Sequence, residues 1–382
     1  MIDDRLARAG LSRLAEPGDV RIPSALAQVG AVRLFEDVLA RRRDSGLAAD
    51  AAPRVAADLD PAVDLERAER SGIRFVVPGD AEWPAQLDDL AHSGTVQELG
   101  GVPVGLWVRG PLRLDELAGA VAVVGSRSAT TYGEDVAREV GAGLARADRP
   151  HVSGAAFGID QASHRGAVAA GGLSVAVLAC GVDRAYPAAH RDLLAHLATT
   201  GGLLSELPPG CAPMRMRFLA RNRVIAALTC GTVLVEAAAR SGALNTASWA
   251  SSLSRPLMGV PGPVTSAQSQ GVHHLLRNGA SLVTGPADVL ELVGGSGQHL
   301  GEEPRGPERP RDHLRRRHHQ VLEAVPVHRP AHLAAIAATA GINLLDTQTA
   351  LTYLAERGFV VHDEVGWRLG ERALADLRKI GP

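Results

Sequence analysis

Short apolar runs rich in β-branched residues recur in the central part of the chain. Residues 120–124 and 232–236 form two such runs, and each is short enough for a strand buried on both faces of a parallel sheet. After the first run, apolar residues recur at four-residue steps at Val136, Val140 and Leu144, as in an amphipathic helix. This alternation predicts an α/β fold with an extended Rossmann-type parallel sheet as its core.

Small and basic residues follow the predicted strands. The first strand runs into Gly125, Ser126 and Arg127, and another strand end leads into segment 153–160, where two glycines precede a helix start at Asp160. The Gly-x-Gly-x-x-Gly fingerprint of dinucleotide-binding folds is absent, and Arg127 occupies the loop where a pyrophosphate would approach bare backbone. We therefore expect the phosphate of an external backbone, rather than a dinucleotide, at this edge of the sheet.

The densest basic pattern surrounds the second predicted strand. Arg221 and Arg223 precede it and are expected near the start of the preceding helix, and Arg240 lies in the turn that follows it. The small residues 241–246 offer backbone amides at a helix N-terminus, where anions bind favourably. Glu236, at the end of the strand, either accepts hydrogen bonds from a bound group or neutralises one of these arginines.

Seven motifs in one order and spacing connect these segments. They are GSR at 125, SGAAFGID at 153, VLACGVDRAYP at 177, SE at 205, RNR at 221, VEAAARSGALNTA at 235 and VPG at 260. Together they cover residues 70–295 and resemble the DNA-processing protein A (DprA/Smf) family. The resemblance implies a fold that binds single-stranded DNA, forms a homodimer through its Rossmann region and hands the strand to the RecA recombinase during uptake of foreign DNA. We accordingly expect a non-catalytic DNA-binding protein without a metal or nucleotide cofactor.

The resemblance extends to individual residues of the expected DNA-binding site. Arg127 matches the family's motif arginine, and residues 218–223 match its F-x-x-R-N-R segment. The chain departs from the family at Arg240, where lysine is frequent, and at Leu219, where proline is frequent, and both changes keep the general chemistry. Arg215 is expected to supply a further phosphate contact.

The predicted nucleic-acid-binding residues come from the strand ends and from the helix before the second strand. They are Gly125, Ser126, Arg127, Ser153, Gly154, Gly158, Asp160, Arg215, Phe218, Arg221, Asn222, Arg223, Glu236, Arg240, Ser241, Gly242 and Thr246. None of them is predicted to be catalytic or to bind a metal.

The acidic members of this set have alternative roles. Asp160 is equally suited to cap its helix and to line a pocket, and a structural hydrogen bond is favoured over an acid–base pair for His164. Glu236 sustains an alternative function, a phosphoribohydrolase-like Rossmann enzyme that uses a Gly-Gly-x-Gly-Thr loop beside a glutamate. The chain has only Cys230-Gly231-Thr232, which lacks the double glycine of that phosphate nest, and the paired arginines suit an extended polyanion better.

Composition restricts how nucleic acid can be bound. The formal net charge of -2 excludes a uniformly basic DNA-coating protein, so a local positive groove must provide the attraction. Lys379 is the only lysine, so arginine must build that groove. Aromatic residues make up 3% of the chain, so base stacking is limited to a few rings such as Phe157 and Phe218, and binding should be phosphate-led and independent of sequence.

Three cysteines without metal spacing indicate reduced thiols in a cytoplasm, and the absence of a long apolar stretch predicts no membrane span.

A chain of 382 residues exceeds a single core, so several domains are expected. Residues 1–70 predict a small helical domain, which in the resembled family is often sterile-alpha-motif-like or helix-hairpin-helix, and residues 71–295 predict the Rossmann domain. The proline-rich, charged stretch 296–315 predicts a flexible linker, and residues 316–382 predict a winged helix. The third helix of that domain lacks a basic face, so protein contact and weak duplex binding both remain open. A regulator acting through the winged helix alone would leave the arginines of the Rossmann edge unused.

Overall fold

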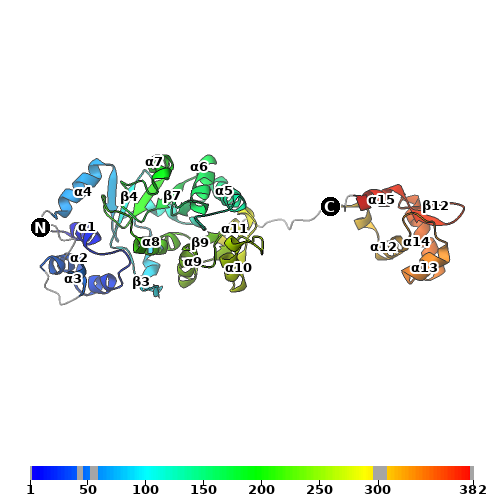
Figure 1. The fold of residues 1–382 in the computed structure, drawn as a ribbon, viewed down its shortest axis with the longest axis horizontal. Coiled ribbons are helices and arrows are strands. Elements are labelled where there is room, and N and C mark those ends of the chain that lie inside the picture. Colours follow the sequence, from blue (N-terminus) through cyan, green and yellow to red (C-terminus); the bar gives the residue numbers. More distant parts are fainter. Residues whose placement is uncertain (1, 41–45, 52–58, 296–307, 379–382) are drawn as a thin grey trace. The chain divides into compact units, whose positions relative to one another are not determined.

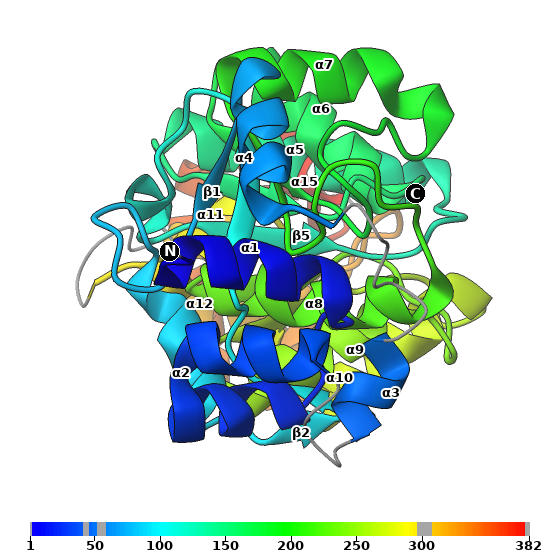
Figure 2. The same ribbon diagram turned by 90° about the vertical axis from the view of Figure 1, so that its left-hand side faces the viewer.

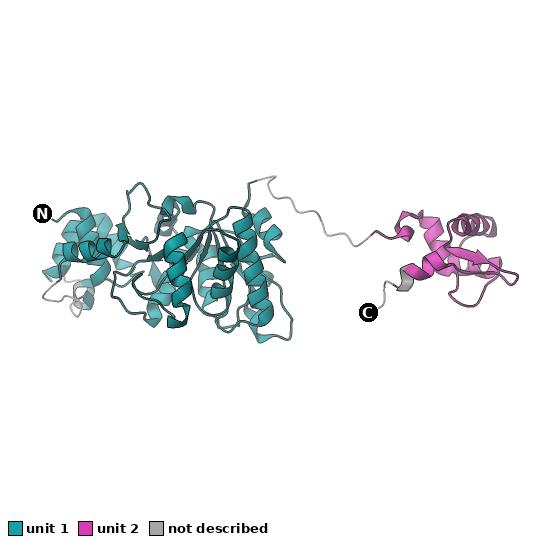
Figure 3. Ribbon diagram, turned by 90° about the horizontal axis from the view of Figure 1, so that it is seen from above, with its two compact units in different colours: residues 1–301 teal, residues 302–382 magenta. Residues whose placement is uncertain are grey.

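The chain divides into two compact units, Met1–Gly301 and Glu302–Pro382 (Figure 3). The computed structural model describes residues 2–40, 46–51, 59–295 and 308–378. The helices expected in residues 1–70 belong to the first unit, together with the Rossmann region.

A nine-stranded sheet forms the centre of the first unit (Figure 1). In spatial order its strands are β1 (Ile73–Val76), β4 (Leu106–Arg109), β8 (Gly202–Ser205), β7 (Ser174–Val177), β6 (His151–Ser153), β5 (Val121–Val124), β9 (Gly231–Leu234), β10 (Leu257–Gly259) and β11 (Ser281–Leu282). Strand β4 pairs antiparallel with β1 and β8, and every other neighbouring pair is parallel. The strand order reverses at β5, which lies between β6 and β9, and open α/β sheets bind ligands at such switch points.

Helices cover both faces of the sheet. They are α5 (Thr131–Arg146), α6 (Ile159–Ala169), α7 (Arg191–Thr200), α8 (Arg215–Leu228), α9 (Ala243–Ser252), α10 (Gln270–Arg277) and α11 (Pro286–Val293). Side chains of β5 alternate between the two faces: Val121 and Val123 pack in one cluster with α5 and α6, and Ala122 and Val124 pack in another with α8 and α9. The apolar runs of the sequence are therefore strands of a parallel sheet with helices on both faces, and the Rossmann-type α/β prediction is confirmed.

Helix α8 begins earlier than the sequence pattern predicts. It starts at Arg215, so Arg221 and Arg223 lie in its middle rather than near its start. Successive helical residues differ by about 100° in direction, so side chains two positions apart point to nearly opposite sides. The two arginines therefore cannot both face the same ligand.

Four further helices lie at the β1 end of the sheet, and Figure 2 views the molecule from that end. They are α1 (Asp4–Leu14), α2 (Arg21–Leu39), α3 (Gly46–Ala51) and α4 (Pro61–Arg70). Gly10 lets α1 and α2 pack closely, because a Cβ at this position would lie 2.2 Å from the ring of Phe35. A short hairpin of β2 (Thr95–Val96) and β3 (Leu99–Gly100) joins this region through an isolated bridge between Asp19 and Leu99.

Within its described residues, the second unit contains a short 3₁₀ helix (Pro310–His313) and three α-helices, followed by an antiparallel hairpin and a last α-helix. Its elements are α12 (Arg316–Ala324), α13 (Leu333–Ala340), α14 (Leu344–Glu356), β12 (Val360–His362), β13 (Trp367–Leu369) and α15 (Glu371–Arg378). Leu314 packs into the core of this unit, so the unit includes the end of the stretch assigned to the linker, whose residues 296–307 lie outside the described ranges. Helices followed by a hairpin are compatible with the expected winged helix, and the winged-helix assignment stays a prediction.

Candidate nucleic-acid interface

A cleft of about 830 Å³ opens at the carboxyl edge of the sheet, beside the switch point. The loops after β5 and β9, the outer side of α8 and the start of α9 form its walls. Twelve of the predicted binding residues line it: Gly125, Ser126, Arg127, Asp160, Arg215, Phe218, Arg221, Asn222, Arg240, Ser241, Gly242 and Thr246. We call this site the arginine cleft.

Charge in the arginine cleft is strongly positive. Arg127, Arg215 and Arg240 are exposed, and Arg221 is buried at its base. Asp160 is the one acidic side chain among the lining residues. Four guanidinium groups against one carboxylate thus concentrate positive charge at this edge, although the whole chain has a formal net charge of -2.

Arg221 is positioned by backbone carbonyls at the ends of two strands. Its Nη1 donates to the carbonyl oxygens of Gly154 and Val177, each at 2.7 Å, while its Nε is buried without a hydrogen-bond partner among the described residues. Burial lowers the pKa of Arg221 to about 10, so the group stays charged at neutral pH. A rigid buried cation at the base of the cleft is suited to attract an anion without reorganisation.

Gly154 is required by this arrangement. A Cβ at this position would lie 1.9 Å from Nη1 of Arg221, so only glycine leaves room for the guanidinium. Asp160 organises the same loop, because its Oδ2 accepts from the amides of Gly154 and Ala156 at 3.2 and 3.3 Å. Burial raises the pKa of Asp160, and the nearby charge of Arg221 opposes that shift. Asp160 lies in the first turn of α6 rather than at its N-cap, which is Gly158.

Phe218 places an aromatic ring at the rim of the cleft. The guanidinium of Arg127 lies over this ring, 4.9 Å from its centroid, and the ring of Tyr186 lies 5.7 Å away. Phe218 is half-buried and Tyr186 is exposed. Aromatic rings and guanidinium planes are the groups on which bases stack in single-strand binding sites.

The turn before α9 differs from the expectation that its amides face an anion. The amide of Ala243 donates to Oγ of Ser241, and the amides of Leu244 and Asn245 donate to the carbonyls of Ser241 and Gly242. Since these three amides donate within the turn, they do not face an anion in the cleft.

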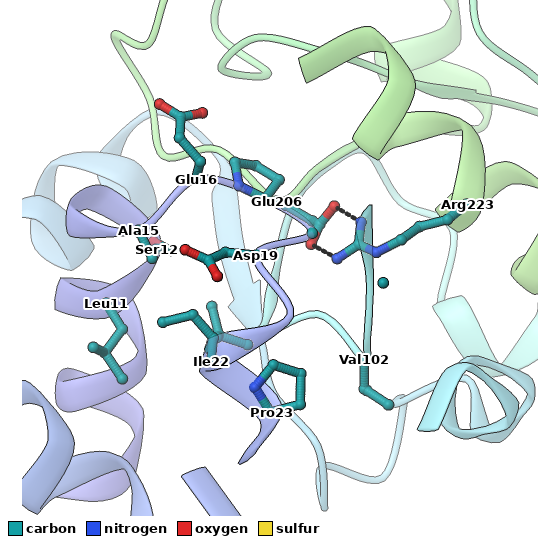
Figure 4. A pocket seen from close by; sticks show the side chains of 14 residues that line it. Leu11, Ser12, Ala15, Glu16, Asp19, Ile22, Pro23, Val102, Glu206 and Arg223 are labelled. Atoms are coloured by element: carbon teal, nitrogen blue, oxygen red, sulfur yellow. Dashed lines mark hydrogen bonds and ion pairs between the residues drawn. The ribbon is translucent and has the colours of Figure 1, made fainter. Parts of the chain in front are cut away.

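Arg223 does not line the arginine cleft. Its two Nη atoms donate to the carboxylate of Glu206 at 2.5 and 2.6 Å, and its Nε donates to the carbonyl of Gly101 at 3.0 Å. Figure 4 shows this pair beside a small cavity against the N-terminal helices. Because Arg223 is 1% exposed and points away from Arg221, its prediction as a phosphate contact was wrong.

Glu236 is likewise used inside the fold. Its carboxylate accepts from the amide and the hydroxyl of Thr130, at 2.8 and 2.6 Å, and it is 2% exposed. Thr130 in turn caps α5 by accepting from the amide of Gly133. The carboxylate therefore holds the start of a helix and does not line the cleft, and within the described ranges it forms no ion pair with an arginine.

The remaining predicted residues support the cleft without lining it. Ser153 is buried and donates to the carbonyl of Val123 at 2.6 Å. Gly158 has a φ of 71°, and a Cβ there would lie 2.3 Å from the carbonyl oxygen of Ser126. Both residues, like Gly154, permit close packing of the loops that carry the cleft.

Several lining residues were not predicted from the sequence. Gln97 reaches the cleft from the β2–β3 hairpin, and Gln268 accepts from Oγ of Ser126 at 3.0 Å. Asn245 links to both sides of the cleft, since it accepts from Asn222 and donates to Gln97. Gln97 lies far from the basic motifs in the sequence, and no periodicity marks it.

Cys180 is a buried free thiol, and burial raises its pKa to about 11. In the described part of the chain, no group of His, Cys, Asp or Glu side chains is arranged to hold a metal ion. Within the same ranges, no helix is long and apolar enough to cross a bilayer.

Comparison with known proteins tests the family that the motifs predicted. The profile of the DNA recombination-mediator protein A family matches residues 74–294. A Mycobacterium tuberculosis (strain H37Rv) relative that carries the DNA processing protein DprA name is 44% identical over 368 residues, covering 95% of this chain and 94% of the relative. Protein Smf of Escherichia coli K12 is 39% identical over 218 residues, 56% of each chain.

A solved structure agrees with these sequence comparisons. The X-ray structure of DNA processing protein A from Streptococcus pneumoniae aligns with a TM-score of 0.61 and 30% identity, covering 76% of this chain and 97% of that one. The prediction made from seven motifs is thus confirmed over the Rossmann region and beyond it. The chain belongs to the DNA recombination-mediator protein A (DprA/Smf) family.

Proposed function

We propose that this protein binds single-stranded DNA in the arginine cleft, protects the strand and delivers it to the RecA recombinase during DNA uptake or related recombination. The observation that supports this most directly is the set of four arginines at one sheet edge in a chain of negative net charge. Delivery to RecA, action as a homodimer and a cytoplasmic location come from the family resemblance.

The shape of the cleft favours a single strand over a duplex. Proteins that read duplex DNA insert a protruding helix or ribbon into a groove. The arginine cleft is concave, so it instead surrounds a strand whose phosphates reach Arg127, Arg215 and Arg240. Phosphates are identical at every nucleotide, so these contacts should be largely independent of base sequence.

The alternative of a phosphoribohydrolase loses its catalytic acid in this arrangement. Glu236 is committed to Thr130 and does not line the cleft. We therefore propose a binding function without hydrolysis.

A salt titration of oligonucleotide binding tests the proposal. Replacing Arg127 or Arg240 with alanine should weaken binding to any single strand and lower the slope of log K against log salt by about 0.7 for each phosphate that is no longer neutralised. Arg184→Ala is the matched control, because this arginine lies outside the cleft and donates to the carbonyl of Gly210. Unchanged slopes in both cleft variants, or tighter binding of nucleoside monophosphates than of DNA, would refute the proposal.

A further inference from the structure

The β2–β3 hairpin has an unusual turn at the edge of the arginine cleft. Thr95 pairs with Gly100 and Val96 with Leu99, which leaves Gln97 and Glu98 as a two-residue turn. Their φ angles are 53° and 66°. Positive φ at both central positions is the type I′ geometry, which usually requires asparagine and glycine, because other residues are strained there.

Contacts on both sides hold this hairpin in place. At its base, the amide of Gly100 donates to the carbonyl of Gly18 at 2.9 Å, which fastens it to the N-terminal helices. At its tip, Oε1 of Gln97 accepts from Nδ2 of Asn245 at 3.1 Å. Strained backbone persists where its surroundings hold it, and such positions cluster at binding sites.

Three side-chain amides form a directional chain across the cleft. Nδ2 of Asn222 donates to Oδ1 of Asn245 at 3.2 Å, and Nδ2 of Asn245 donates to Gln97. Gln97 is exposed and ends the chain. Its Nε2 has no hydrogen-bond partner among the described residues, and its Oε1 keeps a second lone pair. The carboxamide is thus oriented while a donor and an acceptor remain available side by side.

We infer that Gln97 contacts a base of the bound strand and gives the cleft a preference for adenine. This inference rests on the proposed binding of single-stranded DNA. The exposed arginines are suited to the phosphates, whereas a neutral carboxamide offers no charge to match them. A glutamine amide matches the adjacent N6 donor and N7 acceptor of adenine in a bidentate pair, and an unpaired strand exposes these edges.

The base contact and the phosphate contacts differ in their dependence on salt. An arginine that binds a phosphate releases counterions, so its removal lowers the salt slope. Gln97 carries no charge, so its removal should change affinity for one base while the slope stays the same. Binding remains phosphate-led, with a modest base preference added to it.

The test compares a dT oligonucleotide with one of equal length in which every fourth thymine is replaced by adenine, a spacing that leaves no self-complementary run long enough to pair, so both strands stay single. Wild-type protein should bind the adenine-containing strand about fivefold more tightly. Gln97→Gly should remove this preference by lowering the affinity for the adenine-containing strand, with both salt slopes unchanged. Glycine adopts positive φ without strain, so this variant removes the side chain while it keeps the turn. An unchanged thermal unfolding midpoint, or a higher one, verifies that it does.

Glu98→Gly is the matched control in the same turn. It relaxes the backbone but keeps Gln97, so the preference for adenine should persist while both strands bind somewhat more tightly without the acidic side chain. Equal affinity of the wild type for both strands, or an equal decrease for both in Gln97→Gly, would overturn the base contact and leave the proposed function intact. Failure of the wild type to bind either strand would overturn both.

Discussion

Replacing Arg223 with methionine separates structural arginines from DNA-binding arginines in this protein. The side chain is 1% exposed, and its partner Glu206 is 8% exposed. Removing one member of a buried ion pair leaves the other charge uncompensated, at a cost of about 3–5 kcal/mol. Arg223→Met also removes the bond to the carbonyl of Gly101. We therefore expect the free energy of unfolding of the first unit to fall by about this amount.

Urea unfolding followed by tryptophan fluorescence measures the effect, because Trp107 and Trp249 are fully buried in the first unit. The double variant Glu206→Met/Arg223→Met should be more stable than Arg223→Met, since it leaves no buried charge behind. Below its unfolding transition, Arg223→Met should bind DNA with the wild-type salt slope. A decrease of less than about 1 kcal/mol together with a slope lowered by about 0.7 would refute the placement of Arg223 inside the fold.

Three further predictions concern backbone and buried groups. Gly154→Ala should destabilise the protein by about 1–3 kcal/mol through overpacking against Arg221 and weaken DNA binding, as thermal unfolding and titration would detect; an unchanged melting temperature would contradict it. Glu98→Gly should raise the free energy of unfolding by about 1 kcal/mol by relieving a positive φ, and a decrease in urea unfolding would count against that strain. Burial lowers the folded-state pKa of His151 from 6.5 to about 3. The neutral side chain therefore makes its full contribution to the free energy of unfolding above pH 6.5, and this contribution is lost as the pH falls toward 3. By pH 5 the loss should be about 2 kcal/mol, and His151→Asn should show a flatter pH dependence of urea unfolding; equal slopes would exclude this histidine as the cause.

The carboxyl-edge loops were predictable because parallel strands bring their carboxyl ends together. The run at 120–124 is followed by Gly125, Ser126 and Arg127, and in the structure these residues line the cleft as expected. Arg240 was found in the same way, from its place after a buried strand. The local pattern was sufficient to find these loops, because it locates the strands, and in a parallel sheet the loops that follow neighbouring strands meet at the same edge.

The buried charged residues were not predictable in this way. Arg221 and Arg223 look equivalent in the sequence, but one lies at the base of the cleft and the other pairs with Glu206. Glu236 stands at a strand end as ligand-binding acids do, yet Thr130 occupies both of its oxygens. Their roles depend on the direction in which each side chain points and on partners far away along the chain.

The sequence by itself determined the family, the alternation of strands and helices, and the exposed arginines at the sheet edge. Periodicity and short motifs encode these features locally, so they can be recognised without knowing which segments touch. Only the tertiary structure decided which face of α8 meets the cleft and which meets the N-terminal helices, and only it brought Gln97 beside Asn245. The physical reason is that helix orientation and contacts between distant segments follow from the packing of the whole core, which no single stretch of sequence specifies.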